Sequence, residues 1–345
     1  MEKIDFQHLD KPFIIAEMSG NHNHDLERAL NIVKAAKDAG ADAIKLQTYT
    51  ADTMTIDKND GEFFISDDTN MWKGQSLYAL YQQAYTPWEW QEKIFNYAHD
   101  IGIIAFSTPF DLTSVDFLEN LAVPCYKIAS FENIDIPLIR RIAQTGKPII
   151  ASTGMTTVAE LSDLVRTARA GGCTDLTLLK CTSNYPSTPA GSNIRTIPHM
   201  KELFNVQVGL SDHTLGNGVA VASIALGAMV IEKHFTLSRA DGGVDAAFSL
   251  EPAELKQLVR DAQAAYAGLG HISYEVTAEE KPSLVFRRSL YIVEDMKAGD
   301  TITAKNMRSI RPGLGLAPKY YDLVLGRKVK CDVARGTALS FDLLS

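Results

Sequence analysis

The 345-residue sequence contains few cysteines, and their spacing is not that of a metal site or a disulfide framework. The four cysteines, Cys125, Cys173, Cys181 and Cys331, are scattered along the chain, and no two form a Cys-x-x-Cys pair. A small secreted protein held together by disulfides would have a denser pattern. We therefore expect reduced thiols and a cytoplasmic protein.

Long hydrophobic runs and an excess of positive charge are also missing. The most apolar window, residues 219–231, includes Ser223 and Gly227 and is too short to span a bilayer. The first six residues contain no apolar stretch of the secretory type. The net charge of -8 and the pI near 5.5 argue against nucleic acid or an anionic membrane as a partner. A local basic pocket remains compatible with this composition.

One unit recurs along the first 268 residues: a helical segment, a glycine, and a short apolar strand that ends in polar residues. Residues 26–39 have apolar side chains at helical spacing, Gly40 follows, and residues 43–47 form the next expected strand. Further helices are expected at 88–101, 158–170, 217–226 and from 252 onward. The expected strands are 13–17, 43–47, 103–108, 125–130, 148–153, 176–182, 206–211 and 229–234.

Eight such units in a chain of this length predict a closed (β/α)8 TIM barrel over residues 1–268. An open, doubly wound sheet is the alternative. That fold would concentrate polar strand ends at a single switch point, whereas here every strand has one.

Two stretches depart from the repeat. Residues 48–87 are far longer than an ordinary loop and include an expected short helix at 76–85. They form either a lid or dimer element over the barrel rim or a plain insertion.

After a linker at 269–283, residues 284–345 predict a small, mainly β domain. Its short apolar segments are 289–293, 301–303 and 323–325, and tight turns at 297–300 and 334–337 resemble each other.

Lysines stand at the ends of four expected strands, interleaved with Ser and Thr. They are Lys45, Lys127, Lys180 and Lys233. Buried ammonium groups are costly without anions, so lysines at one rim favour a small substrate that carries phosphate and carboxylate. Pairing with carboxylates of the protein itself, such as Glu17, Glu132 and Glu232, is the alternative.

Two histidines end consecutive strands, within Gly209-Leu210-Ser211-Asp212-His213-Thr214 and Glu232-Lys233-His234. A single histidine at such a position is more often a hydrogen-bonded core or rim residue than a ligand. As a pair on neighbouring strands, they indicate half of a site for a divalent first-row metal. Asp212 and Glu232 are candidates to orient the two imidazoles.

These motifs resemble the sialic acid synthase family over nearly the whole chain. The stretches that carry the resemblance are 16–23, 45–48, 107–110, 126–130, 152–155, 181–186, 209–214 and 232–236. Residues 311–316 look like the loop of that family's C-terminal antifreeze-like (SAF) domain. The resemblance implies an enzyme that condenses phosphoenolpyruvate with an open-chain N-acetylated amino sugar. The products are phosphate and a nine-carbon 2-keto acid.

Two short stretches depart from the sialic and legionaminic pattern within the family. They are Met18-Ser19 and residues 241–252, and both look like the pseudaminic acid synthases. The acceptor this implies is 2,4-diacetamido-2,4,6-trideoxy-L-altrose. An N-acetylneuraminate or legionaminate synthase, with an N-acetylmannosamine-type acceptor, is the alternative.

The resemblance also implies roles for particular residues. His213 and His234 would hold a divalent metal (Mn2+, Mg2+ or Co2+), and Glu17, Lys45 and Lys127 would take part in the chemistry. The positions that match phosphoenolpyruvate contacts are Lys45, Thr108, Lys127, Ser130, Ser152, Ser183 and Ser211. Whether Ser183 or Asn184 faces the ligand stays open. The positions that match sugar contacts are Gln47, Glu132, Tyr185, Asp245 and Arg311. Arg311 lies in the small domain, which in the family caps the partner subunit's barrel, so a domain-swapped homodimer is implied.

Two other readings compete. A Schiff-base aldolase would use Lys180 as its nucleophile. A non-catalytic glycan-binding protein would use residues 284–345 alone, although such a protein has little need of several rim lysines.

Overall fold

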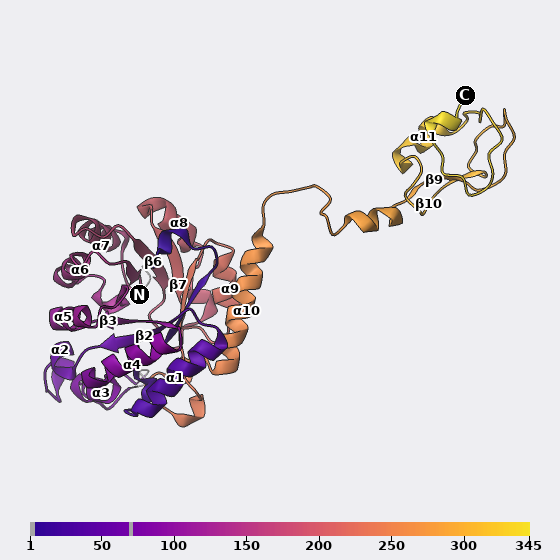
Figure 1. Cartoon of the computed structure of the whole chain (residues 1–345). Coiled ribbons are helices and arrows are strands. Elements are labelled where there is room, and N and C mark those ends of the chain that lie inside the picture. Colours follow the sequence, from indigo (N-terminus) through magenta and orange to yellow (C-terminus); the bar gives the residue numbers. More distant parts are fainter. Residues whose placement is uncertain (1–3, 69–71) are drawn as a thin grey trace. The chain divides into compact units, whose positions relative to one another are not determined.

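The computed structural model describes residues 4–68 and 72–345. The chain forms two compact units, Met1–Gly270 and His271–Ser345 (Figure 1).

The first unit is built on a closed barrel of eight parallel strands. Strand β8 pairs with β1, with Glu17 opposite His234, and this pairing closes the barrel. The strands are β1 Phe13–Glu17, β2 Ala43–Thr48, β3 Ile104–Pro109, β4 Tyr126–Ile128, β5 Ile149–Ser152, β6 Leu176–Cys181, β7 Gln207–Ser211 and β8 Val230–His234. The predicted TIM barrel is confirmed.

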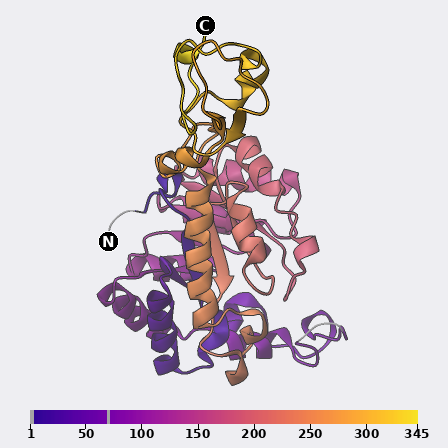
Figure 2. The ribbon, with the colours of Figure 1, turned by 90° about the vertical axis from the view of Figure 1, so that its right-hand side faces the viewer.

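Helices surround the strands, and Figure 2 shows the longest, α10 (orange), along the outside of the barrel. The helices of the ring are α1 Leu26–Ala39, α4 Trp88–Asp100, α5 Leu112–Asn120, α6 Ile136–Ala143, α7 Val158–Ala170, α8 Thr196–Phe204, α9 Gly218–Ile224 and α10 Pro252–Leu269. Helix α1 shows why they form where they do. The Asp25 side chain accepts hydrogen bonds from two backbone N–H groups of the first turn, and Gly40 ends the helix with φ at 91°.

Strand side chains alternate between two apolar layers, and this alternation places the polar residues. Ile15, Ala43, Phe106 and Leu179 belong to a cluster that fills the interior of the barrel. Ile14, Ile44, Leu178 and Ile231 face the other way and pack in a larger cluster with the helices. Because the period of a strand is two residues, the side chain two positions beyond each interior residue also points inward. The interior therefore changes from hydrocarbon to polar groups towards the carboxyl ends of the strands.

Residues 48–87 form α2 Ala51–Met54 and α3 Leu77–Ala84, and residues 69–71 of this stretch lie outside the described residues. The predicted helix at 76–85 is confirmed, with Ser76 as its N-cap. The segment contacts loops at the carboxyl end of the barrel. The Trp72 indole N–H donates to the Val244 carbonyl at 3.4 Å, and the Trp72 and Tyr185 ring centroids are 6.3 Å apart.

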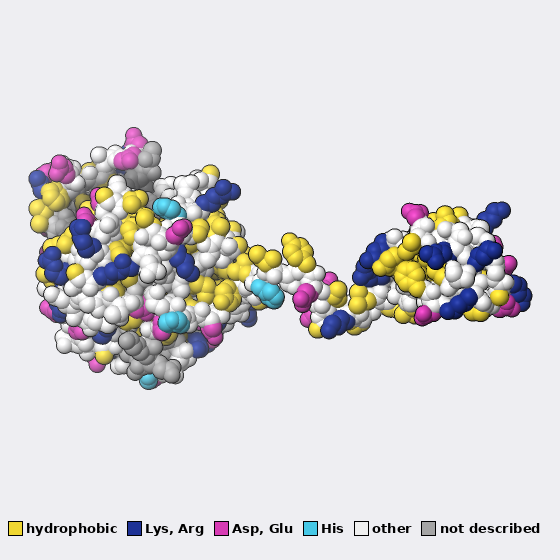
Figure 3. Space-filling view, turned by 90° about the horizontal axis from the view of Figure 1, so that it is seen from above, with side chains coloured by type: hydrophobic (Ala, Val, Ile, Leu, Met, Phe, Trp, Pro, Cys, Tyr) yellow, Lys and Arg dark blue, Asp and Glu magenta, His cyan; other side chains and the backbone are white. Residues whose placement is uncertain are grey.

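The second unit contains two antiparallel strands, β9 Ser289–Ile292 and β10 Met307–Ile310. The two predicted turns are confirmed and are alike: each has a hydrogen bond from its fourth to its first residue and a glycine third, with φ of 93° and 89°. The short apolar segment at 323–325 of this mainly β domain is not a strand, because α11 Tyr321–Val324 covers its first two residues and buries Val324. Figure 3 shows that lysine and arginine side chains gather on the drawn face of this unit, beside a hydrophobic patch.

Within residues 4–68 and 72–345, no helix combines the length and apolar character that a membrane span requires.

Candidate active site

Four charged side chains meet inside the barrel just above the apolar layer. Lys45 forms an ion pair with Glu17, and its Nζ lies 3.9 Å from Oε2 of Glu232. The Lys127 Nζ lies 3.5 Å from Oε1 of Glu232 and donates a hydrogen bond to Oγ of Ser152 at 2.7 Å. All four charged side chains are at most 7% exposed. Two lysines are thus balanced by two carboxylates, so Lys45 and Lys127 are paired with carboxylates of the protein itself.

The pKa values of these groups diverge because burial and pairing compete. Burial raises the pKa of Glu17 to about 7, against the opposing effect of Lys45. Burial disfavours the charged form of Glu232 as well, but Lys127 and Lys45 outweigh it and lower its pKa. Burial lowers the pKa of Lys127. For Lys45 the carboxylates of Glu17 and Glu232 outweigh burial and raise the pKa. Glu17 is therefore the member of the cluster suited to exchange a proton near neutral pH.

Hydroxyl groups surround the two lysines. The Thr108 hydroxyl accepts a hydrogen bond from Lys45 at 3.2 Å, and the Ser211 hydroxyl donates to Glu232 at 3.0 Å. With Ser152, these groups come from strands β3, β5 and β7, so the structure brings these predicted phosphoenolpyruvate contacts together at the carboxyl ends of the strands.

Ser130 and Ser183 converge on the backbone of Gly154, which follows β5. The Gly154 N–H donates to Oγ of Ser130 at 3.1 Å. A Cβ placed on Gly154 would lie less than 3.0 Å from the hydroxyl oxygens of both serines. Sequence reasoning used residues 152–155 as a motif but gave Gly154 no role; a glycine directly after a strand that ends in Ser and Thr was the available signal. Two hydroxyls beside a buried glycine backbone suit a phosphate group.

The two predicted metal-binding histidines lie next to each other, with ring centroids 5.4 Å apart. The Nδ1 of His213 is 3.0 Å from the carbonyl oxygen of Thr182, which as an acceptor fixes the tautomer and leaves Nε2 with its lone pair. The Nδ1 of His234 is buried and has no hydrogen-bond partner, and burial holds the pKa of this imidazole well below its usual value. An unprotonated buried nitrogen without a partner fits a metal ligand.

No larger metal cage accompanies this pair. In the part of the chain that the structure describes, no three His, Cys, Asp or Glu side chains group as metal ligands. A metal held by the two imidazoles would therefore complete its coordination with water or substrate oxygens. Neither Asp212 nor Glu232 hydrogen-bonds to an imidazole, so the expectation that they orient the rings by direct contact is wrong. Asp212 points to the other face of the sheet, where it pairs with Lys233, and Glu232 bonds with Ser211 and the two lysines.

Among the predicted sugar-side residues, Tyr185 lies against the histidines. The Tyr185 ring lies 4.4 Å from the His213 ring and 5.2 Å from the Phe248 ring, measured between centroids. The Gln47 side chain donates to Glu17 at 3.0 Å. Glu132 is largely buried, and burial raises its pKa to about 7. Arg311 belongs to the second unit, so its role stays a prediction.

Asp245 joins the two stretches that set this sequence apart within the family. The Ser19 hydroxyl donates to Oδ2 of Asp245, and the same oxygen lies 3.8 Å from Nδ1 of His234. Ser19 follows β1 and Asp245 follows β8, 226 positions later. Both departures are visible in the sequence, but only the structure shows that they are in contact. Their contact places both beside the histidine pair.

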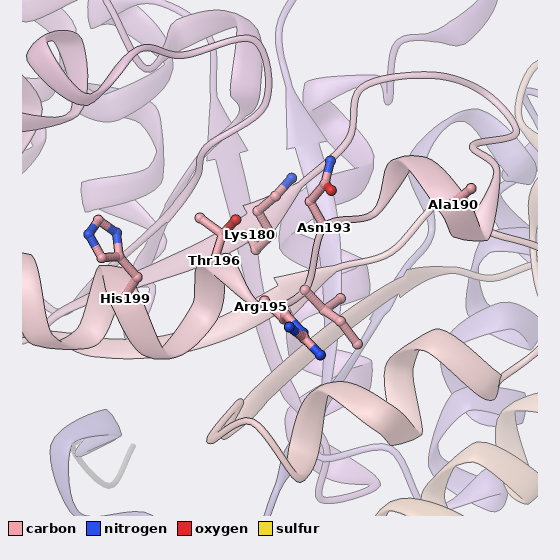
Figure 4. Close-up of a pocket in the computed structure, with 7 residues that line it drawn as sticks. Lys180, Ala190, Asn193, Arg195, Thr196 and His199 are labelled. Atoms are coloured by element: carbon pink, nitrogen blue, oxygen red, sulfur yellow. The ribbon is translucent and has the colours of Figure 1, made fainter.

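Lys180 and Lys233 lie on the outer face of the strands. The Nζ of Lys180 donates to the Cys181 carbonyl at 2.8 Å, and the side chain lines a surface cavity of about 700 Å3 with residues in and before α8 (Figure 4). The Schiff-base reading that relied on Lys180 is therefore wrong, because neighbouring positions on a strand point to opposite faces and Lys180 points away from the interior. Two of the four predicted lysines thus face the site.

Comparison with known proteins agrees with this arrangement. A model of the NeuB family matches residues 32–274, and a SAF domain model matches residues 287–345. A pseudaminic acid synthase of Campylobacter jejuni is 44% identical over 95% of this chain and 95% of its own length. An N,N'-diacetyllegionaminic acid synthase of Legionella pneumophila is 35% identical over 96% of this chain and 94% of its own. The crystal structure of an N-acetylneuraminic acid synthetase from Leptospira borgpetersenii in complex with citrate matches with a TM-score of 0.70 and 29% identity, over 80% of this chain and 90% of that one.

Proposed function

Because this chain belongs to the NeuB family, we propose that it is a pseudaminic acid synthase. It condenses phosphoenolpyruvate with 2,4-diacetamido-2,4,6-trideoxy-L-altrose and water, and it releases pseudaminic acid and phosphate. The observation that carries this proposal is the division of the barrel mouth. Lys45, Lys127 and their hydroxyls occupy one side, the histidine pair occupies the other, and Glu17 lies between them.

The lysine side fits phosphoenolpyruvate. Lys45 and Lys127 are held by Glu17 and Glu232, and a bound phosphate or carboxylate would add anionic partners for these buried ammonium groups. The Ser130 and Ser183 hydroxyls above Gly154 supply neutral donors for phosphate oxygens. In the proposed complex, the C3 carbon of phosphoenolpyruvate faces the acceptor sugar.

The histidine side fits the acceptor aldehyde. His213 and His234 would hold a divalent ion, Mn2+, Mg2+ or Co2+, which when bound supplies Lewis-acid polarisation of the sugar carbonyl. Tyr185 and Phe248 offer aromatic faces beside the histidines, and the Ser19–Asp245 pair offers polar contacts. These groups would hold the open-chain sugar against the phosphoenolpyruvate carbon.

In the proposed reaction, C3 of phosphoenolpyruvate bonds to the aldehyde carbon, and the aldehyde oxygen gains a proton. Water then adds to the cationic C2 and loses a proton, and the C–O bond to phosphate breaks. Glu17, whose pKa is raised to about 7 by burial, is placed to orient this water and accept its proton. Lys45 and Lys127 stabilise the negative charge that the departing phosphate takes with it.

A panel of acceptors tests the function. With phosphoenolpyruvate and Mn2+, phosphate release should accompany the altro trideoxy sugar and be absent with N-acetylmannosamine. A chelator should stop turnover and Mn2+ should restore it. Turnover of an N-acetylmannosamine-type sugar instead would favour the alternative sialic or legionaminic synthase, to which the lower identity of 35% already gives less support.

The proposal includes a homodimer in which the small domain of one chain covers the barrel of the other. Residues 271–345 contain twelve Lys and Arg against nine Asp and Glu, while the whole chain has a net charge of -8. The small domain is therefore positively charged and the barrel negatively charged, and this complementarity favours their association. Mixing and refolding Arg311→Ala with Lys127→Met tests it, since only a swapped dimer rebuilds one intact site from two inactive chains. About a quarter of the wild-type activity should return, and no recovery would exclude the swap.

We also propose that the enzyme acts in the cytoplasm, where its four free cysteines would stay reduced.

A further inference from the structure

A buried ion pair lies directly behind the two histidines, on the outer face of the sheet. The Nζ of Lys233 is 2.9 Å from Oδ2 of Asp212, and the two side chains are 1% and 2% exposed. Asp212 precedes His213 and Lys233 precedes His234, so each partner is the chain neighbour of one histidine. The alternation along the strands turns the histidines inward and this pair outward.

The ammonium group of Lys233 donates hydrogen bonds to three acceptors. Besides Asp212, its Nζ donates to the carbonyl oxygens of Thr214 at 2.6 Å and Gly216 at 2.8 Å. The Asp212 carboxylate also accepts from the Thr214 backbone N–H at 3.0 Å and from the Thr214 hydroxyl at 3.1 Å. The ammonium group thus cross-links the turn that follows His213 to the strand that ends at His234.

The two histidines depend on this cross-link to different degrees. His213 has its own anchor, since its ring contacts the Thr182 carbonyl and its backbone carbonyl accepts from Ser187 at 3.0 Å. His234 has no hydrogen-bond partner on Nδ1; its ring packs against Phe248, with centroids 4.9 Å apart, and its backbone carbonyl accepts from the Leu250 N–H at 2.8 Å. The side chain of Lys233 joins β8, one residue before His234, to the turn that follows His213.

Stability alone does not account for a buried ion pair, because an apolar pair of similar volume is often as stable. An apolar pair, however, could not hold the carbonyls of Thr214 and Gly216. We propose that Asp212 and Lys233 are positioning residues that fix the spacing of His213 and His234 and thereby the affinity of this pair for a divalent metal. This inference rests on the metal site of the proposed function.

The test measures metal binding without turnover. Mn2+ is titrated into the full-length metal-free protein, and free Mn2+ is followed by electron paramagnetic resonance. Loss of a group that positions a metal ligand typically weakens affinity about 10- to 100-fold, and we expect this for Lys233→Met. Phosphoenolpyruvate binding, measured by calorimetry, should change less than about twofold, because the contacts of Lys45 and Lys127 are untouched.

Lys11→Met is the matched control. Lys11 pairs with Asp42 at 2.9 Å, a lysine–aspartate bridge between the starts of β1 and β2, at the opposite end of the barrel from the histidines. Its removal should leave the affinity for Mn2+ unchanged. If Lys233→Met does not fold, Asp212→Asn replaces it, since that variant leaves no unpaired carboxylate and can keep the bond to Thr214.

The outcomes separate this inference from the function on which it rests. If the wild-type protein binds Mn2+, His234→Ala abolishes binding, and both Lys233→Met and Asp212→Asn keep wild-type affinity, the positioning role is overturned while the proposed metal site stands. If the wild-type protein binds no Mn2+, or His234→Ala binds it equally well, the metal site itself fails and the positioning role fails with it. Weaker Mn2+ binding in Lys233→Met or Asp212→Asn at a preserved melting temperature supports the inference most directly.

Discussion

Replacing Gly154 by alanine should abolish tight phosphoenolpyruvate binding while leaving the barrel folded. The added Cβ would lie less than 3.0 Å from the hydroxyl oxygens of Ser130 and Ser183, a distance that no stable contact allows. Both oxygens are on side chains that can rotate, so the clash is relieved by moving the hydroxyls away. The backbone of Gly154 has no positive φ and accepts alanine. Moving the Ser130 hydroxyl leaves the buried Gly154 N–H without its acceptor, so the free energy of unfolding should fall by about 1 to 3 kcal/mol, which a folded barrel tolerates.

The binding loss follows from the two displaced hydroxyls. A hydrogen bond to a charged group contributes about 1.5 to 3 kcal/mol, so two contribute about 3 to 6 kcal/mol. Since about 1.4 kcal/mol is a factor of ten, the dissociation constant for phosphoenolpyruvate should rise by about two to four powers of ten. The KM for the sugar at saturating phosphoenolpyruvate should stay close to wild type, because the histidine side of the mouth is unaltered.

Calorimetric titration with phosphoenolpyruvate and a thermal melt together measure both effects. Gly218→Ala is the control, since a Cβ at this first residue of α9 would meet nothing within 4 Å. Wild-type phosphoenolpyruvate affinity in Gly154→Ala would refute the assignment of Ser130 and Ser183 to the phosphate. Loss of affinity together with unfolding would show that the site and the fold cannot be separated at this position, contrary to the geometry.

Three further perturbations probe other parts of the site. Glu17 has a pKa of about 7 and must be ionised to accept a proton from water, so kcat should rise as the pH passes through about 7. A kcat that stays constant from about pH 5.5 to about pH 8.5 would contradict this role. Lys180→Met should keep near-wild-type turnover, because the Lys180 side chain points away from the interior of the barrel. For the same reason, borohydride with pyruvate should trap no adduct on the wild-type protein, which mass spectrometry of the treated protein checks. Ser19→Ala removes a hydrogen bond to Asp245 and should raise the KM for the sugar about tenfold or more with an unchanged KM for phosphoenolpyruvate, as steady-state kinetics with each substrate varied will show.

The amino-acid sequence by itself determined the architecture. Helical spacing in segments such as residues 26–39, the glycines that end them, and short apolar strands are local patterns, and eight repeats leave few ways to build a core. The sequence also located the carboxyl ends of the strands, because each apolar run stops in polar residues. His213 and His234 could be paired on this basis alone, since neighbouring parallel strands end at the same rim.

Only the tertiary structure decided which polar strand-end residues face the site. Parallel barrel strands are buried on both faces, so β1, β7 and much of β8 show no alternation of polar and apolar residues from which direction could be read. If the register of a strand shifts by one residue, each of its side chains moves to the opposite face of the sheet. Without the register, the sequence could not distinguish Lys180 and Lys233 from Lys45 and Lys127. Closure of the barrel fixes the register, sends two lysines inward and two outward, and brings Ser19 to Asp245 and Gly154 to Ser183 across long stretches of chain.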